Sequence, residues 1–303
     1  MSERLHRLLR WVPLLFVLLW STGFIGAKYG LPYIEPFYML FLRMLLTLVV
    51  FAVLMKMFGA RPLSLRQAGH QMVTGLLVHG AYLGGVFAAI DWQMPAGIAS
   101  LLVGLQPLLT AVVAWFWLGN RLQVVQWAGL LLGLAGVALV LLGGGRAASF
   151  DLAWPALLST LLALVGISLG TLYQKRFGQG GDLLSGSFYQ YLATALLMGL
   201  LSFSFESREV SWHPQLILAL LWLVFGLSVS AILLLMLMIR EGEAARVASY
   251  FYLVPPVTAM EAWWLFDERL APLSLAGIAV AVLGVYLVIR PKPASDGKAA
   301  LAR

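Results

Sequence analysis

The chain has 303 residues, of which 61% are hydrophobic and 11% charged, and its formal net charge is +7. A soluble domain is about half apolar and about a quarter charged, so this composition indicates an integral membrane protein. The absence of cysteine excludes disulfides, thiolate metal sites and cysteine nucleophiles. The basic residues do not gather on one soluble face, which argues against a nucleic-acid partner.

The apolar residues occur in blocks of about 20, the length of an α-helix that crosses a ~30 Å hydrocarbon core. The first block follows Arg4, Arg7 and Arg10, but no small-residue cleavage site precedes a soluble domain, so we interpret it as a retained span. Apolar runs and the turn residues between them predict ten transmembrane helices, which in chain order cover residues 12–31, 36–57, 71–91, 95–118, 123–142, 154–174, 184–204, 216–239, 244–265 and 272–290.

Positive charge is distributed unevenly between the two sides that these spans define. About 15 of the 20 Lys and Arg residues fall on the side of the termini, whereas only Arg146, Arg208 and Arg269 fall on the other. The positive-inside rule therefore predicts cytoplasmic N and C termini. A missed helix would mix the charges of all later loops, so the asymmetry also supports an even number of spans.

The chain also contains an internal repeat. Pro107 and Trp115 in the predicted fourth span align with Pro256 and Trp264 in the ninth, and the match continues through the next turn and helix. Each copy holds five spans, so the second copy crosses the membrane in the opposite sense, as in secondary transporters that work by alternating access. The predicted organisation is a five-helix repeat at 12–142, a linker at 143–153, an inverted five-helix repeat at 154–290 and a cytoplasmic tail at 291–303.

Several segments resemble a known family. The opening LLWSTGFIGAKYGLP, the FLRMLL of the second span, and the paired LQPLLTAVVAWFWLGNRL and LVPPVTAMEAWWLFDERL are similar to the EamA family of the drug/metabolite transporter superfamily. The resemblance covers residues 12–290 and implies a multi-pass carrier of the bacterial inner membrane, usually an exporter of amino acids, related metabolites or toxic compounds, with a cavity between its halves. Asn120 departs from the pattern, because the family often has an acidic residue there and the second copy keeps Glu268.

Charged residues inside a predicted span cost roughly 2.5 to 3.5 kcal/mol on insertion scales, so each suggests a function. We expect Arg43, in the second span, to bind a substrate carboxylate through its planar fork of donors. Glu261, in the ninth span, is the candidate for a substrate ammonium group or a coupling proton. The alternative for both is an ion pair that locks two helices, and Lys28, near the end of the first span, is also explained by snorkelling.

Polar and aromatic residues inside the spans are further candidates for the wall of a central cavity. Intramembrane amides and hydroxyls also bond neighbouring helices, a lone histidine is often a neutral hydrogen-bonding partner, and Tyr and Trp also pack, so a structural role is the alternative for each. Besides Arg43, the predicted substrate-binding residues are Trp20, His79, Tyr82, Gln106, Gln190 and Tyr252.

Prolines and glycines interrupt several spans. Pro107, Pro255 and Pro256 break the helical hydrogen-bond ladder, and we expect hinges there, with a static kink as the alternative. The small-residue face formed by glycines within residues 129–136 predicts close helix packing, either inside the chain or in a homodimer. Both a monomer and a homodimer are compatible with this pattern.

No pattern of a known catalytic site, phosphate loop or metal cluster occurs, so we expect no enzymatic activity, metal or cofactor. A channel is a nearer alternative, but duplicated halves without a ring-forming filter favour a carrier. The predicted function is a secondary transporter of the inner membrane that exports amino acids or related compounds, with a small molecule, the lipid bilayer and, if Glu261 couples transport, a proton as partners. Import or uniport of another metabolite and efflux of lipophilic cationic drugs are the alternatives, because the sequence determines neither substrate, direction nor coupling.

Overall fold

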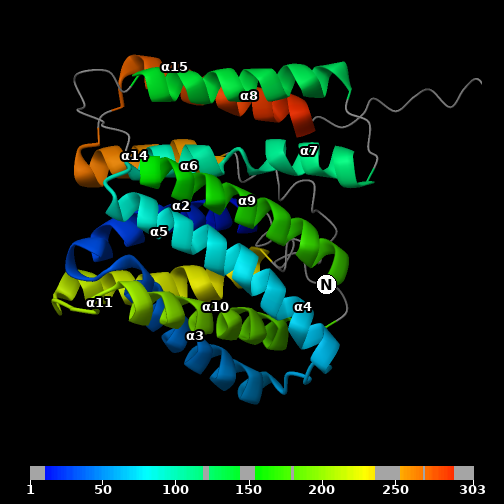
Figure 1. Ribbon diagram of the computed structural model, residues 1–303, viewed down its shortest axis with the longest axis vertical. Helices are drawn as coiled ribbons and strands as arrows, with labels where there is room; N and C mark the ends of the chain where they lie inside the picture. Colours follow the sequence, from blue (N-terminus) through cyan, green and yellow to red (C-terminus); the bar gives the residue numbers. More distant parts are fainter. Residues whose placement is uncertain are drawn as a thin grey trace, which may run out of the picture.

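The structure is a computed structural model that describes residues 11–118, 123–143, 154–178, 181–235, 253–268 and 270–289. The elements in these ranges are all helical, apart from an isolated bridge between Ile34 and Val210. Figure 1 shows α2 (Val12–Gly30), α3 (Pro36–Phe58), α4 (Leu65–Gly75), α5 (Tyr82–Asp91), α6 (Ala96–Val103), α7 (Gln106–Leu118), α8 (Val124–Gly143), α9 (Trp154–Phe177), α10 (Leu183–Phe205), α11 (Pro214–Leu221), α14 (Val254–Phe266) and α15 (Pro272–Ile289). Three further segments are the 3₁₀ turn η1 (Leu31–Tyr33) and the π-helical segments η2 (Leu76–Ala81) and η3 (Trp222–Ala231).

Six helices in the described part of the chain are long and apolar enough to cross a bilayer. Shorter apolar helices begin at Ala96, Val124 and Pro272, and every described helix overlaps a span predicted from the sequence. The fold is therefore that of a multi-pass α-helical membrane protein. Residues 236–252, which belong to the predicted eighth and ninth spans, lie outside the described residues. The six long helices are Val12–Tyr33, Pro36–Phe58, Leu65–Asp91, Trp154–Phe177, Leu183–Phe205 and Pro214–Leu235.

The third span is longer than predicted. It begins at Leu65 instead of residue 71, because Ser64 and Gln67 form a capping box in which each side chain bonds the other residue's backbone N–H. This cap starts the helix in a polar segment that hydropathy alone assigns to a loop. The helix then continues without interruption through α4, η2 and α5 to Asp91.

The predicted fourth span is broken into two helices. α6 ends at Val103, Gly104 and Leu105 form a turn, and α7 begins at Gln106. Pro107 follows directly, and its nitrogen has no hydrogen with which to continue the hydrogen-bond ladder across the turn. The break thus lies where the sequence predicts a hinge.

The helices lie side by side in layers, as Figure 1 shows. α8 packs against α15 in an outer layer, α3 packs on α10, and α6 packs on α14. α2 contacts α11, η3 and α14, whereas α9 contacts α4, η2 and α5. Each of these contacts pairs an element of the first half of the chain with an element of the second half. The two halves of the chain therefore form one bundle.

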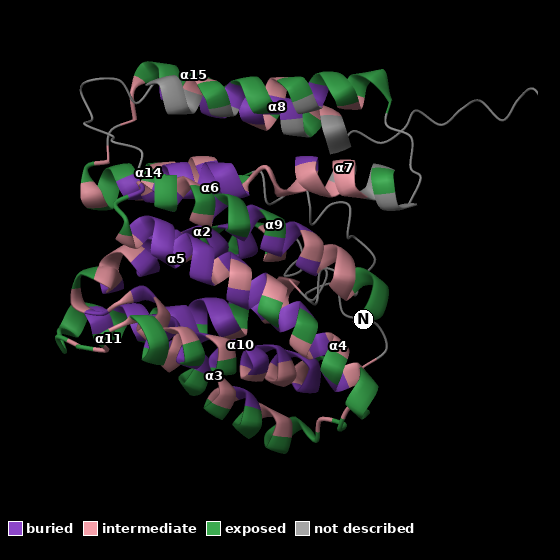
Figure 2. Ribbon diagram, in the orientation of Figure 1, coloured by how far each residue is buried: buried purple, intermediate pink, exposed green. Residues whose placement is uncertain are grey.

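Burial follows these layers, and Figure 2 shows the buried residues concentrated in α2, α5 and α6. The outer helices expose large apolar side chains, among them Val49 of α3, Leu131 of α8, Leu200 of α10 and Leu283 of α15. Lipid tails solvate such side chains as well as a protein core does. Polar side chains such as Arg43 and those of several Ser and Thr residues are instead enclosed within the bundle.

At one end of the bundle, a carboxylate fixes the start of α3. Glu206 follows α10 and accepts the backbone N–H groups of Phe37 and Tyr38, both at 2.7 Å, where the helix dipole favours negative charge. Burial raises the pKa of Glu206 above its ordinary value, although these two donors oppose the shift. Glu35 makes the reciprocal connection by accepting the backbone N–H of Arg208 at 2.7 Å. The first turn of α3 is thereby fixed against α10, and this positions Arg43 two turns further along the helix.

Candidate substrate cavity

A cavity lies between helices of both halves and contains about 470 Å³ of empty space. Its wall comes from α2, α3, η2 and α5 of the first half and from α10, η3 and the helical residues that continue from η3 in the second. The described residues that line it are Trp20, Gly23, Phe24, Arg43, Val78, His79, Tyr82, Leu83, Val86, Phe87, Tyr191, Leu227 and Ile232.

A second, smaller cavity adjoins the first. Trp20, Phe24 and Tyr82 belong to the walls of both, so these three aromatic side chains separate the two spaces. The second cavity also reaches the break between α6 and α7 and the first turn of α14. Its remaining described lining residues are Ser100, Val103, Gly104, Gln106, Pro107, Ile167, Val254 and Pro255.

Arg43 is the charged residue among the described lining residues of the first cavity, and only 3% of it is exposed. Its Nε donates to the Oγ of Ser228 in η3 at 3.1 Å. Among the described residues, no carboxylate lies within ion-pair distance of Arg43. The guanidinium group therefore has a neutral partner here and keeps donors for an anion, since a guanidinium carries five N–H groups.

His79 lies beside this arginine on the cavity wall. Its ring stacks on that of Tyr191, with centroids 4.5 Å apart and an interplanar angle of 19°. Tyr191 donates in turn to the backbone carbonyl of Ser228 at 3.3 Å. The His79 Nε2 atom is buried and has no hydrogen-bond partner in the described part of the chain. It is available to a polar group of a bound molecule.

Both π-helical segments contribute residues to this site, and the sequence analysis did not predict them. η2 carries His79, and η3 carries Ser228, the partner of Arg43. A π turn widens a helix by one residue and is frequent at functional sites. The sequence prediction also missed Phe24 and Phe87 in the wall, because aromatic residues occur on lipid-facing surfaces as well and no local pattern separates the two environments.

The other predicted binding residues have different surroundings. Gln106 lines the second cavity, and its Nε2 donates to the Oγ1 of Thr171 in α9 at 3.3 Å. Gln190 is buried but belongs to neither of these two walls, and its Nε2 donates to the Oε1 of Gln71 at 2.6 Å. Tyr252 lies outside the described residues. Of the predicted hinge residues, Pro107 and Pro255 line the second cavity, and Pro256 lies beside them in the first turn of α14.

Glu261 lies between α2 and α14, outside the walls of both cavities. Its Oε1 accepts the Oγ of Ser21, a fully buried residue of α2, at 2.9 Å. Its Oε2 is buried and has no hydrogen-bond partner among the described residues. The residue that Glu261 bonds, Ser21, directly follows the wall residue Trp20 in α2.

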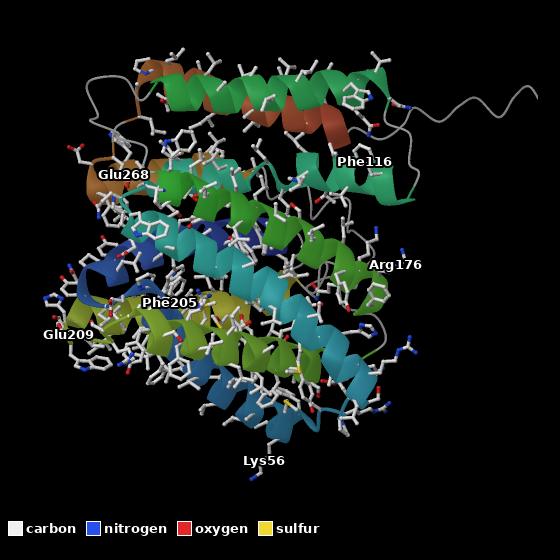
Figure 3. The ribbon with its side chains drawn as sticks, viewed as in Figure 1. Lys56, Phe116, Arg176, Phe205, Glu209 and Glu268 are labelled. Atoms are coloured by element: carbon white, nitrogen blue, oxygen red, sulfur yellow. The ribbon has the colours of Figure 1, made fainter. Side chains whose placement is uncertain are left out.

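An ion pair joins Lys28 and Glu268 at the end of the bundle where Figure 3 shows Glu268 and Glu209, opposite Arg176. Lys28 belongs to the last turn of α2, whereas Glu268 follows α14. The Lys28 ammonium also lies 4.6 Å from the ring centroid of Phe266. Glu268 accepts in addition the backbone N–H of Ala96, at the start of α6, at 3.4 Å. Three helices are thus connected at this end.

A cavity between the two halves of a multi-pass helical bundle, whose described lining holds one cation and several aromatic side chains, is where a membrane carrier binds its substrate. The sequence model of the EamA-like transporter family matches residues 10–142 and 154–290, so the chain belongs to that family. This result confirms the family predicted from the sequence, and the protein is a membrane transporter.

Individual relatives point the same way. The chain is 29% identical over 288 residues to a probable amino-acid metabolite efflux pump of Salmonella typhimurium, and the match covers 91% of this chain and 93% of the relative. It is 26% identical to the uncharacterized inner membrane transporter YedA of Escherichia coli, covering 94% and 92% of the two chains. A match of 32% identity to the uncharacterized transporter YvbV of Bacillus subtilis covers 64% of this chain and 63% of that protein.

A solved crystal structure resembles this fold with a TM-score of 0.66 and 22% identity, and the match covers 91% of this chain and 94% of the other. At this identity, the likeness concerns the fold alone. It agrees with the helical bundle described above and carries no information on the substrate.

Proposed function

We propose that this protein is a secondary transporter of the bacterial inner membrane that exports amino acids or related metabolites through the cavity around Arg43. The observation that carries the proposal is a buried guanidinium group in an aromatic cavity, without a carboxylate partner among the described residues. A buried arginine that no protein anion neutralises is suited to hold the carboxylate of a substrate. The efflux-pump name of the Salmonella relative and the membrane named for the E. coli relative support the direction and location.

The mechanism that we propose is alternating access between two inverted five-helix repeats, with ten spans in all and both termini in the cytoplasm. Three contacts support it, because α3 with α10, α6 with α14 and α8 with α15 pair corresponding helices of the two halves. Such pairs are expected across a pseudo-two-fold axis in the membrane plane. The family model also matches the chain twice, once in each half.

In this mechanism, the Lys28–Glu268 pair closes the outer end of the bundle. It joins α2 and α6 to the segment after α14, and the second cavity below it is lined by Pro107 and Pro255, where the helix ladder is interrupted. Opening toward the outside would separate the two charges while the interrupted helices bend. The corresponding position in the first repeat is Asn120, so the inner end would lack this charge pair.

Neutralising this pair is expected to favour the outward-open state. In Glu268→Gln, a single cysteine introduced at Leu227 of the cavity wall should react about fivefold faster with a membrane-impermeant thiol reagent added outside, because a partly buried ion pair contributes ~1 kcal/mol. The natural chain has no cysteine, so the label reports this position alone. Lys56→Gln, which removes an exposed lysine, is the control. Unchanged labelling in Glu268→Gln would show that the pair does not hold the outer end closed.

Glu261 is the residue that we propose for proton coupling. One of its oxygens is buried without a described partner, and a carboxyl group in such a place exchanges a proton when the surrounding helices move apart. Its position outside both cavity walls argues against a role as the acidic group that binds a lipophilic cation. The cationic-drug alternative therefore has less support than the export of carboxylates.

Glu261→Gln is expected to transport at a rate that no longer depends on the pH gradient. The amide keeps an oxygen that accepts the Ser21 hydroxyl, but it cannot release a proton. Efflux from proteoliposomes should be measured with and without a pH gradient, beside Glu209→Gln, which changes an exposed residue. If efflux by the wild-type protein does not depend on the pH gradient, transport is facilitated diffusion and the coupling role proposed for Glu261 is wrong.

The proposed function itself is tested by efflux from proteoliposomes. Purified protein is reconstituted, a panel of labelled amino acids and their carboxylate derivatives is loaded, and efflux is compared with that from liposomes without protein. Protein-dependent efflux of at least one carboxylate is the expected result. If only amines or cationic dyes leave the vesicles, or if no compound does, the proposed substrate class is wrong.

A further inference from the structure

The charges around the cavity restrict the proposed substrate beyond the requirement for a carboxylate group. Arg43 supplies a positive charge, and none of the described lining residues of either cavity is acidic. The intramembrane carboxyl group of Glu261 accepts the Ser21 hydroxyl and is not among the described lining residues of either cavity. A zwitterionic amino acid would therefore bring its ammonium group into a low-dielectric space whose described lining holds a cation and no anion.

The uncharged polar groups of the cavity suit a different substituent. The Nε2 atom of His79 is buried without a described partner, and neutral imidazole nitrogen bonds a carbonyl or an amide N–H. Tyr82 adds a phenolic hydroxyl to the same wall, and the Tyr191 oxygen, whose hydrogen is donated to Ser228, adds an acceptor. These groups can satisfy an acyl or hydroxyl substituent, whereas none of them balances the full charge of an ammonium ion.

The rest of the cavity wall is apolar and aromatic, which favours a substrate with a flat apolar group. Trp20, Phe24 and Phe87 join the two tyrosines in the wall around the guanidinium group. Aromatic rings pack favourably on such side chains in offset or edge-to-face arrangements. A compound with one ring and one carboxylate thus uses both features of the cavity.

We infer that the preferred substrates are aromatic carboxylates that carry no free ammonium group, such as N-acylated aromatic amino acids or arylalkanoic acids. This inference rests on the proposed function, since it assumes that the cavity around Arg43 is the transport site. Such a compound bears one negative charge, so the inside-negative membrane potential of a bacterium drives it outward. A zwitterion moved alone would gain nothing from that potential.

The test uses four probes that share a phenyl ring and differ in charge. N-acetylphenylalanine and 3-phenylpropionate are anions, phenylalanine is a zwitterion, and phenethylamine is a cation. Equilibrium binding to the purified full-length protein and efflux from proteoliposomes are measured for each probe. The two anions should bind about tenfold or more tighter than phenylalanine, because an unpaired buried charge is strongly disfavoured, and phenethylamine should not bind. Efflux of the anions should accelerate when a potassium gradient with valinomycin makes the vesicle interior negative.

The outcomes separate this inference from the proposed function. If phenylalanine binds as tightly as N-acetylphenylalanine and its efflux ignores the potential, the inference is overturned, while carboxylate export stands. If none of the four probes binds or moves although other carboxylates do, the aromatic preference is wrong. If no carboxylate of any kind is transported, the proposed function itself is wrong, and so is the inference that rests on it. The comparison is made on the wild-type protein, so it does not depend on whether a variant folds.

Discussion

Replacing Arg43 with glutamine should reduce carboxylate efflux by about 100-fold or more, which corresponds to ~2.7 kcal/mol. Hydrogen bonds to a charged group contribute about 1.5 to 3 kcal/mol, and the variant loses both the charge and the paired donors of the guanidinium group. Glutamine still reaches the Ser228 hydroxyl that Arg43 bonds, so the contact between α3 and η3 has a neutral replacement. Initial efflux rates from proteoliposomes with equal protein content measure the effect.

Two comparisons distinguish a binding role of Arg43 from a structural one. Arg66→Gln changes an exposed arginine on α4 and should transport at the wild-type rate. Ser228→Ala removes the neutral partner of Arg43 but leaves the cation, so it should lower the rate far less than Arg43→Gln. If Arg43→Gln is folded by gel filtration and thermal unfolding yet transports normally, Arg43 has a structural role and the cavity around it is not the transport site.

The sequence predicted those features that depend on local composition. Long apolar runs indicate spans, and the described helices overlap them because no other structure satisfies backbone polar groups in lipid. A charge within such a run is conspicuous for the same reason, and Arg43 does lie on the wall of a cavity. The break at Pro107 was also visible, since proline interrupts the ladder wherever it occurs in a helix.

What the sequence left open depends on which face of each helix turns inward. In an apolar helix surrounded by lipid and protein, both faces look alike, so amphipathic periodicity does not separate Gln190, which bonds Gln71, from Tyr191, which lines the cavity. The π-helical segments that carry His79 and Ser228 result from tertiary packing rather than from a local pattern. The partner of each glycine-rich face was likewise unknown until the helices were assembled.

The contact between α8 and α15 shows how such a glycine face is used, and it leads to the prediction with the largest effect on folding. A Cβ atom added at Gly284 would lie 2.6 Å from the backbone carbonyl oxygen of Gly129, and one added at Gly136 would lie 2.6 Å from that of Gly277. Helix backbones touch at both points, so the small-residue face predicted at residues 129–136 packs within the chain.

Gly284→Leu is therefore expected to force α8 and α15 apart and to lower the unfolding temperature markedly. Overpacking costs about 1 to 3 kcal/mol even where side chains can adjust, and here the obstacle is backbone. Van der Waals packing also supplies much of the attraction between helices in lipid, so little compensates for the lost contact. Thermal unfolding in detergent, followed by gel filtration, measures the loss.

Ala279→Leu is the matched control, because it adds the same side chain to an exposed position of the same helix. It should unfold like the wild type, since a lipid-facing leucine meets only acyl chains. Equal stability of the two variants would mean that α8 and α15 separate without cost and that the glycine contact does not hold this layer to the bundle. A loss confined to Gly284→Leu, with normal substrate binding in the protein that remains folded, would instead show that the outer layer supports the fold without shaping the cavity.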